Sequence, residues 1–313
     1  MLLIFRLIRL LVNKTLSFSV LVLVVSTFAY AESIPRYNFH RAGLGEGRVP
    51  YETALATRLI EISQSKFGPA KIGFEDTIFN AHRTRKLIEK GRMIHFFSGG
   101  FLGRTNALTL TEAESIKFPP ILVSEPILNN LLGYRRLIVR LEEEGRFWSV
   151  NSLDEFRRFK VGQGFAWTDV GIFKFNGIDV VEAEEYQYLF PMLSRKRFDY
   201  ISLGVGEVDH PFSANPEFKN KFSVVEDIVI FYPFPVHFFV TPTMPELADR
   251  LEYALKQMKA TGEFDVLFSK YFGGKISQID RNTTKVFVLK SPDGTLSPEK
   301  SQPNLFKRAT IIR

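Results

Sequence analysis

The sequence predicts an α/β protein in which strands alternate with helices. Several segments carry apolar residues at spacings of three and four, which indicates amphipathic helices. Between these segments lie short apolar runs bounded by glycine or polar residues, which are typical of buried strands. The chain has 313 residues, 45% of them hydrophobic, which is enough for the core of one large domain or two ordinary ones. Alternation of this kind favours parallel strands joined by helical crossovers.

The first half of the chain is predicted to run strand, helix, strand, helix, strand. The expected elements are a strand at 36–41, a helix from about Tyr51, a strand at 70–75, a helix at 77–90 and a buried strand at 93–97. Leu55, Leu59 and Ile62 share one face of the first helix, because they recur at steps of four and three. Gly91 ends the second helix, since glycine is common just after a helix terminus.

The second half is expected to repeat this alternation and to close with helices. The expected elements are a strand at 131–141, a helix from about Ser152, a strand at 159–162, a helix at 183–193, a strand at 197–202, helices across 245–258 and 264–271, and a strand at 285–289. Residues 228–240 are nearly all apolar, but Pro233 and Pro235 exclude one regular central strand. Two short strands with a bend between them are expected there.

The residue composition excludes several kinds of chemistry. The chain contains no cysteine, so disulfides, cysteine zinc sites, iron–sulfur clusters and a thiol nucleophile are ruled out. The five histidines are scattered, so a metal site would need residues distant in the sequence, and no cofactor is expected. No Gly-x-Ser-x-Gly elbow supports nucleophilic catalysis.

The N-terminus has the three-part layout of a secretory signal. Arg6, Arg9 and Lys14 are followed by an uncharged stretch at 15–29, and small residues at the two positions read by signal peptidase predict cleavage after Ala31. The alternative is an uncleaved membrane anchor, but the uncharged run is shorter than the roughly 20 residues that span a bilayer. We expect a soluble periplasmic protein with no stable membrane insertion after cleavage.

Cleavage also changes the meaning of the net charge. The full chain carries +7, and removal of the three basic residues of the signal leaves +4. Residues 281–313 hold seven basic and two acidic residues, so the body at 32–280 is close to neutral. The positive excess therefore lies at the ends of the precursor rather than on a binding face. No RNA-binding motif occurs, so nucleic acid is not an expected partner.

The segment 162–164 (Gly-Gln-Gly) lies between a predicted strand and helix, where a dinucleotide fingerprint would stand. Trp167 occupies the third glycine position and would block the approach of a pyrophosphate, so nucleotide binding is not expected. The helix N-terminus near Thr168 and Asp169 suits a polar or anionic ligand group instead, unless Asp169 itself caps the helix. Trp167 would either wall a ligand pocket or pack in the core.

Several motifs follow one another in a recognisable order. They are Ser152-Leu153-Asp154-Glu155-Phe156 with Val161-Gly162-Gln163-Gly164, Phe118-Pro119-Pro120, Phe238-Phe239-Val240-Thr241-Pro242 with Pro245-Glu246-Leu247, Gly262-Glu263-Phe264, and Tyr271-Phe272-Gly273. Over about 36–275 the chain resembles the bacterial extracellular solute-binding proteins that include the polar amino-acid receptors of ABC transporters. The motifs look like the start of that family's second lobe, the segment before its first crossing, and its closing strand and helices.

The resemblance implies a two-lobed, type 2 periplasmic binding protein-like fold, in which each lobe is a mixed sheet flanked by helices and two hinge strands join the lobes. The implied division is a signal peptide at 1–31, a discontinuous first lobe at 32–132 and 234–280, a second lobe at 133–233 and a basic C-terminal extension at 281–313. Hinge crossings are expected near 131–137 and 229–236. A ligand in the interlobe cleft would contact both lobes and favour their closure.

On such a scaffold the ligand-binding residues face the cleft from both lobes. The expected ones are Tyr37, Phe97, Ser98, Arg104, Trp167, Thr168, Asp169, Ser202 and Glu207. The amino-acid receptors hold the ligand carboxylate with an arginine before the first crossing, but the corresponding stretch here, 110–114, has none. Arg104 is the candidate to replace it from the preceding loop. Ser202 and Glu207 are the substitutes for an acidic residue that the family carries in its second lobe.

The expected function is that of a periplasmic solute-binding protein that is not an enzyme. Its expected partners are a small-molecule solute, either an amino acid or another small organic compound, and the permease of an ABC transporter, with sensor input as another use. Two further functions stay open. One is an exported dehydratase-like enzyme, with Glu207, Asp169 or His95 as acid/base candidates. The other is an orphan bilobed interaction protein that no longer binds a solute.

Overall fold

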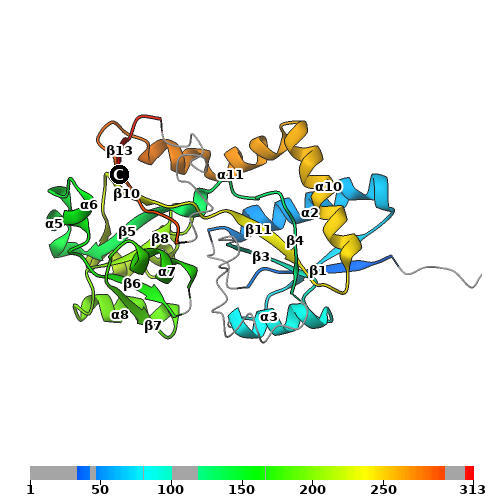
Figure 1. Ribbon diagram of the computed structural model, residues 1–313, viewed down its shortest axis with the longest axis horizontal. Coiled ribbons are helices and arrows are strands. Elements are labelled where there is room, and N and C mark those ends of the chain that lie inside the picture. The colour runs from blue at the N-terminus through cyan, green and yellow to red at the C-terminus, as the bar shows by residue number, and fades with distance from the viewer. Residues whose placement is uncertain (1–33, 43–46, 80, 101–118, 166, 293–306) are drawn as a thin grey trace, which may run out of the picture. The chain divides into compact units, whose positions relative to one another are not determined.

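The computed structural model describes residues 34–42, 47–79, 81–100, 119–165, 167–292 and 307–313. Contacts divide the chain into two units, residues 1–35 and 36–313. The signal peptide predicted for 1–31 lies outside the described residues. In its described part, the second unit contains two sheets with helices packed on their faces (Figure 1).

The first sheet is built mainly from the N-terminal part of this unit. Its elements are β1 (Arg36–His40), α2 (Val49–Phe67), β2 (Lys71–Glu75), α3 (Ala81–Lys90), β3 (Phe96–Gly100), β4 (Ile121–Leu122) and β11 (Val236–Val240). The strand order is β2-β1-β3-β11-β4, with β1 parallel to β2 and β3, and β11 antiparallel to β3 and β4. The predicted alternation of strands and helices is confirmed here, although the second helix begins at Ala81 rather than at 77.

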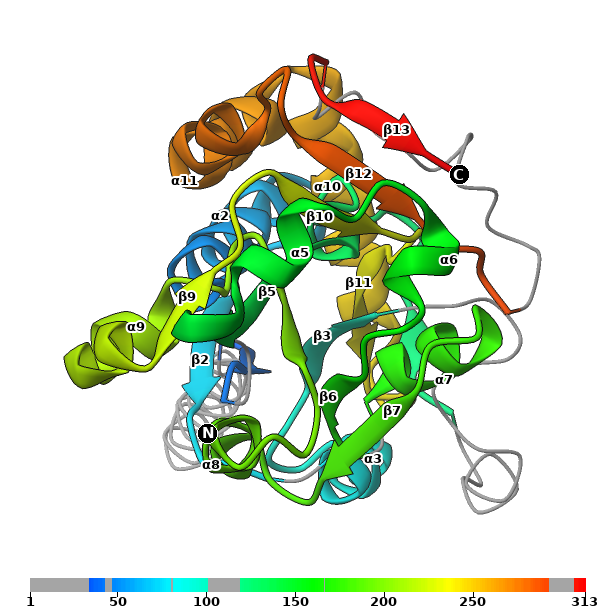
Figure 2. The same cartoon turned by 90° about the vertical axis from the view of Figure 1, so that its left-hand side faces the viewer.

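The second sheet contains more strands among the described residues. They are β5 (Tyr134–Arg140), β6 (Val161–Gly164), β7 (Val180–Ala183), β8 (Tyr200–Gly204), β9 (Phe222–Val224), β10 (Ile228–Phe231), β12 (Lys285–Val288) and β13 (Thr310–Ile312). Their order is β13-β12-β10-β5-β8-β6-β7, and β9 pairs with β5 (Figure 2). β6 runs parallel to β7 and β8, whereas β5 runs antiparallel to β8 and β10. Both sheets are therefore mixed.

The remaining helices complete the layers. They are α5 (Gly145–Trp148), α6 (Leu153–Phe156), α7 (Thr168–Phe175), α8 (Leu189–Ser194), α9 (His210–Ala214), α10 (Pro245–Ala260) and α11 (Glu263–Ile279), with 3-10 turns at Leu131–Gly133, Leu141–Glu143, Tyr186–Tyr188 and Pro216–Asn220. The helix predicted at 183–193 is wrong at its start, because β7 extends to Ala183 and α8 begins only at Leu189. Pro191 explains the late start, since proline is tolerated in the first turn of a helix but not in its interior.

In the described part, the chain passes between the two sheets three times. It passes from β4 to β5, returns from β10 to β11, and enters the second sheet again after α11 as β12. The first two passages touch, because Tyr232 N–H donates to the Gly133 carbonyl at 3.2 Å and Phe234 N–H donates to Asn130 Oδ1 at 3.1 Å. A Cβ on Gly133 would lie 2.1 Å from the Tyr232 carbonyl oxygen, so this close approach requires glycine.

Asp280, just after α11, fixes the C-terminal strand. Its carboxylate accepts the backbone N–H groups of Lys307, Arg308 and Ala309. Burial alone would raise the pKa of Asp280, but these three donors hold it below its ordinary value. β12 pairs with β10 on one side and with β13 on the other. Two segments of the predicted C-terminal extension are therefore strands of the second sheet.

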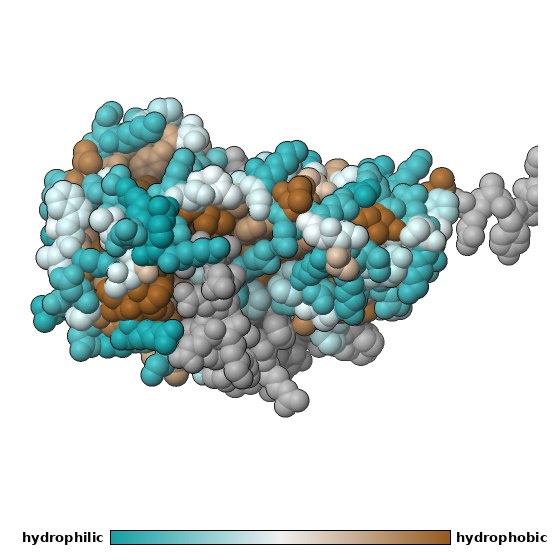
Figure 3. Space-filling model, turned by 90° about the horizontal axis from the view of Figure 1, so that it is seen from above, coloured by the Kyte–Doolittle hydropathy of each residue, from teal (hydrophilic) through white to brown (hydrophobic). Residues whose placement is uncertain are grey.

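One cluster of buried apolar side chains runs from the first sheet into the second. On α2, Tyr51, Leu55 and Leu59 are fully buried, as their spacing predicts. Tyr51 packs against Phe272 of α11, with ring centroids 5.0 Å apart. The face in Figure 3 is mostly hydrophilic, with hydrophobic residues in separate patches. No helix among the described residues is long and apolar enough to cross a membrane.

Candidate functional site

Charged side chains gather where the two sheets meet. We name five of them the junction network: Arg48, Glu52, Arg135, Asp169 and Glu207. The first two belong to the first-sheet side, and the other three belong to the second-sheet side. Four of the five are less than 9% exposed. Because burying a charge is costly unless it is paired, the contacts of each group decide what the network can do.

The first-sheet side forms at the start of α2, which carries Pro50 in its first turn. Arg48 and Glu52 stand one helical turn apart and therefore face the same way. The Arg48 guanidinium donates to Glu52 Oε1 through Nε at 2.8 Å and through Nη2 at 2.5 Å. Ser98 on β3 donates its hydroxyl proton to Glu52 Oε2. The fully buried Glu52 carboxylate thus has a charged partner and a neutral donor.

The second-sheet side centres on Arg135, near the start of β5. Its Nη2 lies 2.5 Å from Oδ1 of Asp169, which stands in the first turn of α7. Tyr232 donates its hydroxyl proton to the same oxygen, and burial raises the pKa of Tyr232 well above its ordinary value, so the phenol stays a donor. The guanidinium also lies 5.4 Å from the Tyr232 ring centroid, a favourable cation–π arrangement. Asp169 thus pairs with Arg135, and the N-cap residue of α7 is Trp167.

Glu207, which follows β8, joins the two sides. Its Oε1 lies 3.5 Å from Arg48 Nη1, and its Oε2 lies 3.6 Å from Arg135 Nη1. The backbones also meet here, because a Cβ on Gly47 would lie 1.8 Å from the carbonyl oxygen of Gly206. Only glycine at 47 permits that approach. The network therefore connects the start of α2 with the turn after β8.

Both guanidinium groups stay charged in spite of their burial. Burial by itself lowers the pKa of Arg48, but the carboxylates of Glu52 and Glu207 outweigh it and hold the pKa above its ordinary value. Burial likewise lowers the pKa of Arg135, and the attraction of Asp169 outweighs it in the same way. The network is therefore ionic rather than neutral.

Buried polar atoms without a hydrogen-bond partner among the described residues lie beside the network. They include Arg135 Nε, Gln163 Oε1 and Ser202 Oγ. Gln163 and Ser202 are fully buried neighbours on β6 and β8, and Gln163 Nε2 donates to the Ser202 carbonyl at 3.2 Å. Ser202 pairs with Leu137, two residues from Arg135, so the side chains of Ser202 and Arg135 share one face of the sheet. Unpaired polar atoms at such depth indicate a place for water or a ligand.

The structure brings four of the nine expected ligand-binding residues to the junction. Three have direct contacts in the network: Ser98, Asp169 and Glu207. The fourth, Ser202, contributes one of the unpaired atoms beside it. Trp167 and Thr168 immediately precede Asp169, and the Trp167 ring stacks on Tyr186 at 6.2 Å.

The other three expected residues are placed differently. Phe97 stacks on an aromatic ring of β11, with centroids 5.3 Å apart. Tyr37 lies near the start of β1, buried beneath the Arg250 guanidinium at 5.7 Å, and takes no part in the network. Arg104 lies outside the described residues, as does the whole segment 101–118.

The sequence interpretation missed Arg48, Glu52, Arg135 and Gln163. A signal for Arg135 was present, because an arginine in a predicted strand that also carries Leu137, Ile138 and Val139 needs a partner if it is buried. Arg48 and Glu52 are opposite charges four residues apart at a helix start, which is also readable. Nothing local indicates that Gln163, inside the Gly-Gln-Gly segment, is a buried side chain with an unpaired oxygen.

Solved structures with a similar arrangement cover about three quarters of the chain. An ancestral arginine-binding protein bound to glutamine is 19% identical, with 77% of this chain and 100% of that one covered and a TM-score of 0.52. The fold is that of the two-lobed periplasmic binding proteins. A Salmonella typhimurium periplasmic binding protein of high arginine specificity is 14% identical (76% and 99% covered, TM-score 0.52). An arginine transport periplasmic binding protein from Legionella pneumophila is 16% identical (77% and 100% covered, TM-score 0.52).

These identities establish the fold and no more. No family model matches the sequence, and the search of curated proteins gives no match. The two-lobed α/β fold class expected from the sequence is confirmed. Each mixed sheet corresponds to one lobe of this fold, so the junction network lies between the lobes.

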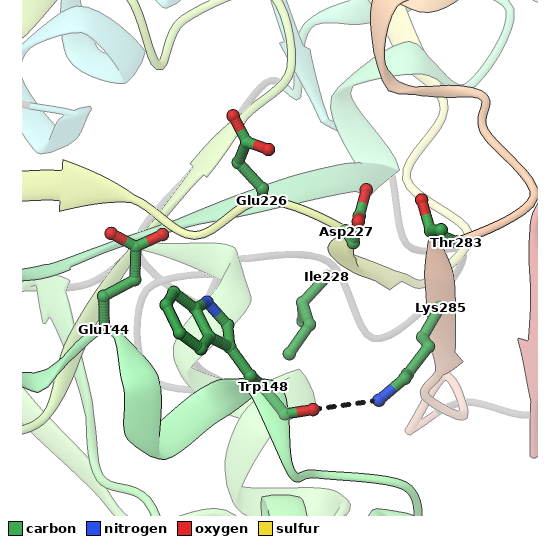
Figure 4. A pocket seen from close by; sticks show the side chains of 7 residues that line it. All are labelled: Glu144, Trp148, Glu226, Asp227, Ile228, Thr283 and Lys285. Carbon is green, nitrogen blue, oxygen red and sulfur yellow. Dashed lines mark hydrogen bonds between the residues drawn. The ribbon is translucent and has the colours of Figure 1, made fainter.

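A cavity of about 360 Å³ shares no residue with the network (Figure 4). It is lined by Glu144, Trp148, Glu226, Asp227, Ile228, Thr283 and Lys285. Lys285 Nζ donates to three oxygens of the segment 148–151 at 2.9–3.2 Å, and Asp227 pairs with Arg281 at 2.8 Å. The protein itself therefore satisfies much of the charge around this cavity. No group of three or more His, Asp or Glu residues in the described part could hold a metal ion.

Proposed function

We propose that the protein is a periplasmic solute-binding protein, not an enzyme, that closes over a small organic molecule between its lobes. The solute then passes to the permease of an ABC transporter or serves as the input of a sensor. The proposal includes export by the segment 1–31 with cleavage after Ala31. It also includes a first lobe at 32–132 and 234–280 and a second lobe at 133–233.

The junction network is the observation that carries the proposal. It gathers buried charges from both sheets at one place, although well-packed apolar residues are often at least as stabilising as buried ion pairs. Clusters of this kind are enriched at functional sites. A solute bound there contacts both lobes, and it favours the closed form by the difference between its affinities for the closed and open forms. The arginine and glutamine bound by proteins of similar fold support a small polar solute.

The enzymatic alternative needs an acid or base that is free to move a proton. Asp169 and Glu207 face guanidinium groups within the network. His95 accepts the backbone N–H of Asn38 through Nδ1 at 3.0 Å, and burial lowers its pKa. These pairings favour binding over proton transfer.

The test starts from the full-length gene, expressed in a Gram-negative host, with the protein recovered from the periplasm. Intact mass spectrometry of that protein checks cleavage after Ala31. Thermal unfolding is then followed with amino acids, organic acids and amines. A solute at about 100 times its Kd stabilises the folded state by roughly 2.7 kcal/mol, which corresponds to a rise in Tm of about 4–5 °C in a chain of this size.

Calorimetric titrations of three variants locate the site. Trp167→Ala and Glu207→Gln are expected to weaken binding without unfolding the protein. Glu217→Gln is the matched control, because Glu217 is exposed and lies in the 3-10 turn Pro216–Asn220, which contributes no residue to the network. Unchanged affinity in both site variants contradicts the assignment to the junction. If no compound of the three solute classes raises Tm, the orphan interaction protein is favoured. If a compound that raises Tm is also converted to a product, the enzyme is favoured.

A further inference from the structure

We infer that the solute is an organic cation without a carboxylate group, such as an amine or a guanidine, and that Glu207 binds its charged group. This inference rests on the proposed solute-binding function and names the substrate class of the same site. It departs from the amino acids, glutamine and arginine, that two of the similar proteins bind.

The charge of the junction network is the first argument. Three carboxylates face two guanidinium groups, and each guanidinium lies 2.5 Å from a carboxylate of its own, Glu52 for Arg48 and Asp169 for Arg135. Glu207 is the carboxylate left over. Its nearest guanidinium nitrogens, at 3.5 and 3.6 Å, belong to groups that are already paired.

The surroundings of Glu207 make that excess charge costly. Its side chain is only 14% exposed, and a backbone N–H, that of Gly204, donates to Oε2 at 3.1 Å. A nearly buried carboxylate lacks most of its hydration, and Glu207 regains only part of it from two guanidinium groups that are each paired more closely with another carboxylate. A cationic solute group beside Glu207 neutralises the excess negative charge of the network, and Arg48 keeps its ion pair with Glu52.

A solute carboxylate meets the opposite conditions. It would add a fourth negative charge to the network, and it would have to displace Glu52 or Asp169 from a guanidinium. Both side chains are held in place by further donors, the hydroxyl groups of Ser98 and Tyr232. A free carboxylate cannot compete well with one that the chain already positions.

The unpaired atoms beside the network agree with a cation that carries N–H groups. Gln163 Oε1 is an acceptor, and Ser202 Oγ can accept as well as donate. Both are fully buried and aligned on neighbouring strands, so two N–H donors of an ammonium or guanidinium group satisfy them. Arg135 Nε is the remaining unpaired donor. Because Asp169 already neutralises the charge of that guanidinium, a water molecule or a neutral oxygen of the solute is enough to accept its hydrogen bond.

The test compares pairs of compounds that differ only in a carboxylate. Arginine is compared with agmatine, and lysine with cadaverine, by calorimetry on the protein recovered from the periplasm. The decarboxylated member of at least one pair is expected to bind at least about tenfold more tightly than the amino acid. In Glu207→Gln that preference falls to about twofold or less, since Gln keeps the acceptor for the Gly204 N–H but loses the charge. Glu217→Gln retains it.

The outcomes separate this inference from the proposed function. Equal or tighter binding of arginine and lysine overturns the inference and leaves the solute-binding function standing. Binding of an organic acid in place of the amines does the same. If no compound of any class binds, the proposed function fails, and the inference fails with it.

Discussion

Strand β5 carries a buried arginine at each end, and the two serve different purposes. Arg135 near its start belongs to the junction network, and Arg140 at its end belongs to a second group of ion pairs. The two arginines are about equally buried, since the exposed fraction is 4% for Arg135 and 3% for Arg140. Because successive side chains of a strand alternate, residues 135 and 140 lie on opposite faces of the sheet. One strand therefore offers an internal comparison.

The group around Arg140 lies wholly on the second-sheet side. Arg140 Nη1 donates to the carbonyls of Leu193 and Phe198 at 2.7 Å each, and Nη2 pairs with Glu143. Arg146 pairs with Glu143 at 2.7 Å and with Asp199 at 3.1 Å, and Lys196 lies 3.4 Å from Glu143. Cations outnumber carboxylates in this group, and backbone carbonyls accept hydrogen bonds from Arg140, its buried cation. This group secures the turns at the end of the sheet.

The contrast separates a structural ion-pair group from a candidate binding site. The group around Arg140 lies on the side of one sheet, and its N–H groups donate to backbone carbonyls and carboxylates. The junction network connects two sheets, has a carboxylate in excess, and lies beside unpaired buried oxygens of Gln163 and Ser202. Burial alone would not distinguish the two arginines. The balance of charge and the unpaired oxygens of Gln163 and Ser202 do, whereas a buried guanidinium Nε without a partner occurs in both groups.

The largest expected effects come from replacing either arginine of β5, beginning with Arg135→Met. It leaves Asp169 buried without its cation, so the free energy of unfolding should fall by about 3–5 kcal/mol. Adding Asp169→Asn should restore more than half of that loss, because the amide oxygen still accepts from Tyr232 and position 169 no longer carries a buried charge without its cation. Urea unfolding measures both values.

The matched pair at the other end of β5 should behave differently. Arg140→Met removes the donor from two backbone carbonyls, which costs about 1–3 kcal/mol for each unsatisfied group. Adding Glu143→Gln should restore nothing, since the carbonyls of Leu193 and Phe198 remain unpaired. Equal recovery in the two double variants would contradict the distinction between the networks.

A smaller effect is expected from acid. Hydrogen bonds from Arg140, with help from Arg146, lower the pKa of Glu143 to about 2, although burial opposes them. A lowered folded-state pKa stabilises the protein above the unfolded value of 4.5, and that stability is lost as the pH falls from about 4.5 towards 2. After allowance for solvent screening, the contribution is about 1–2 kcal/mol.

The measurement is the difference in unfolding free energy between the wild type and Glu143→Gln as a function of pH. We expect this difference to be constant above pH 5 and to shrink steadily between pH 4.5 and pH 2. A difference that does not change over that range would show that Glu143 contributes little through its charge.

Much of the fold could be predicted because local patterns decide it. The buried face of α2 follows from the spacing of Leu55 and Leu59, and the bend between β10 and β11 follows from Pro233 and Pro235. The error at 183–193 arose where apolar spacing was weighed without Pro191, which restricts where a helix can begin. Periodicity alone thus places elements well and their starts less well.

The candidate site was only half predictable, because its pairings are long-range. Asp169 and Glu207 stand in recognisable positions after strands, but their partners Arg135 and Arg48 come from other elements. The excess of one carboxylate is a property of the assembled group and has no local signature. Nor does the sequence show which polar atoms, such as Gln163 Oε1, are left unpaired once the sheets form.

The smallest expected effect on stability, and the sharpest test of the comparison, is that of Glu207→Gln without solute. The substitution removes the one carboxylate whose two cations, at 3.5 and 3.6 Å, are each paired more closely with another carboxylate, so the excess negative charge of the network is removed while the acceptor for the Gly204 N–H is kept. The free energy of unfolding should therefore change by less than about 1 kcal/mol, and we expect a slight increase rather than a decrease. Glu143→Gln, which removes a carboxylate with several close cations, should cost more at neutral pH. If Glu207→Gln instead costs as much as Arg135→Met, Glu207 is a structural partner of the two arginines, and its charge is not available to a solute.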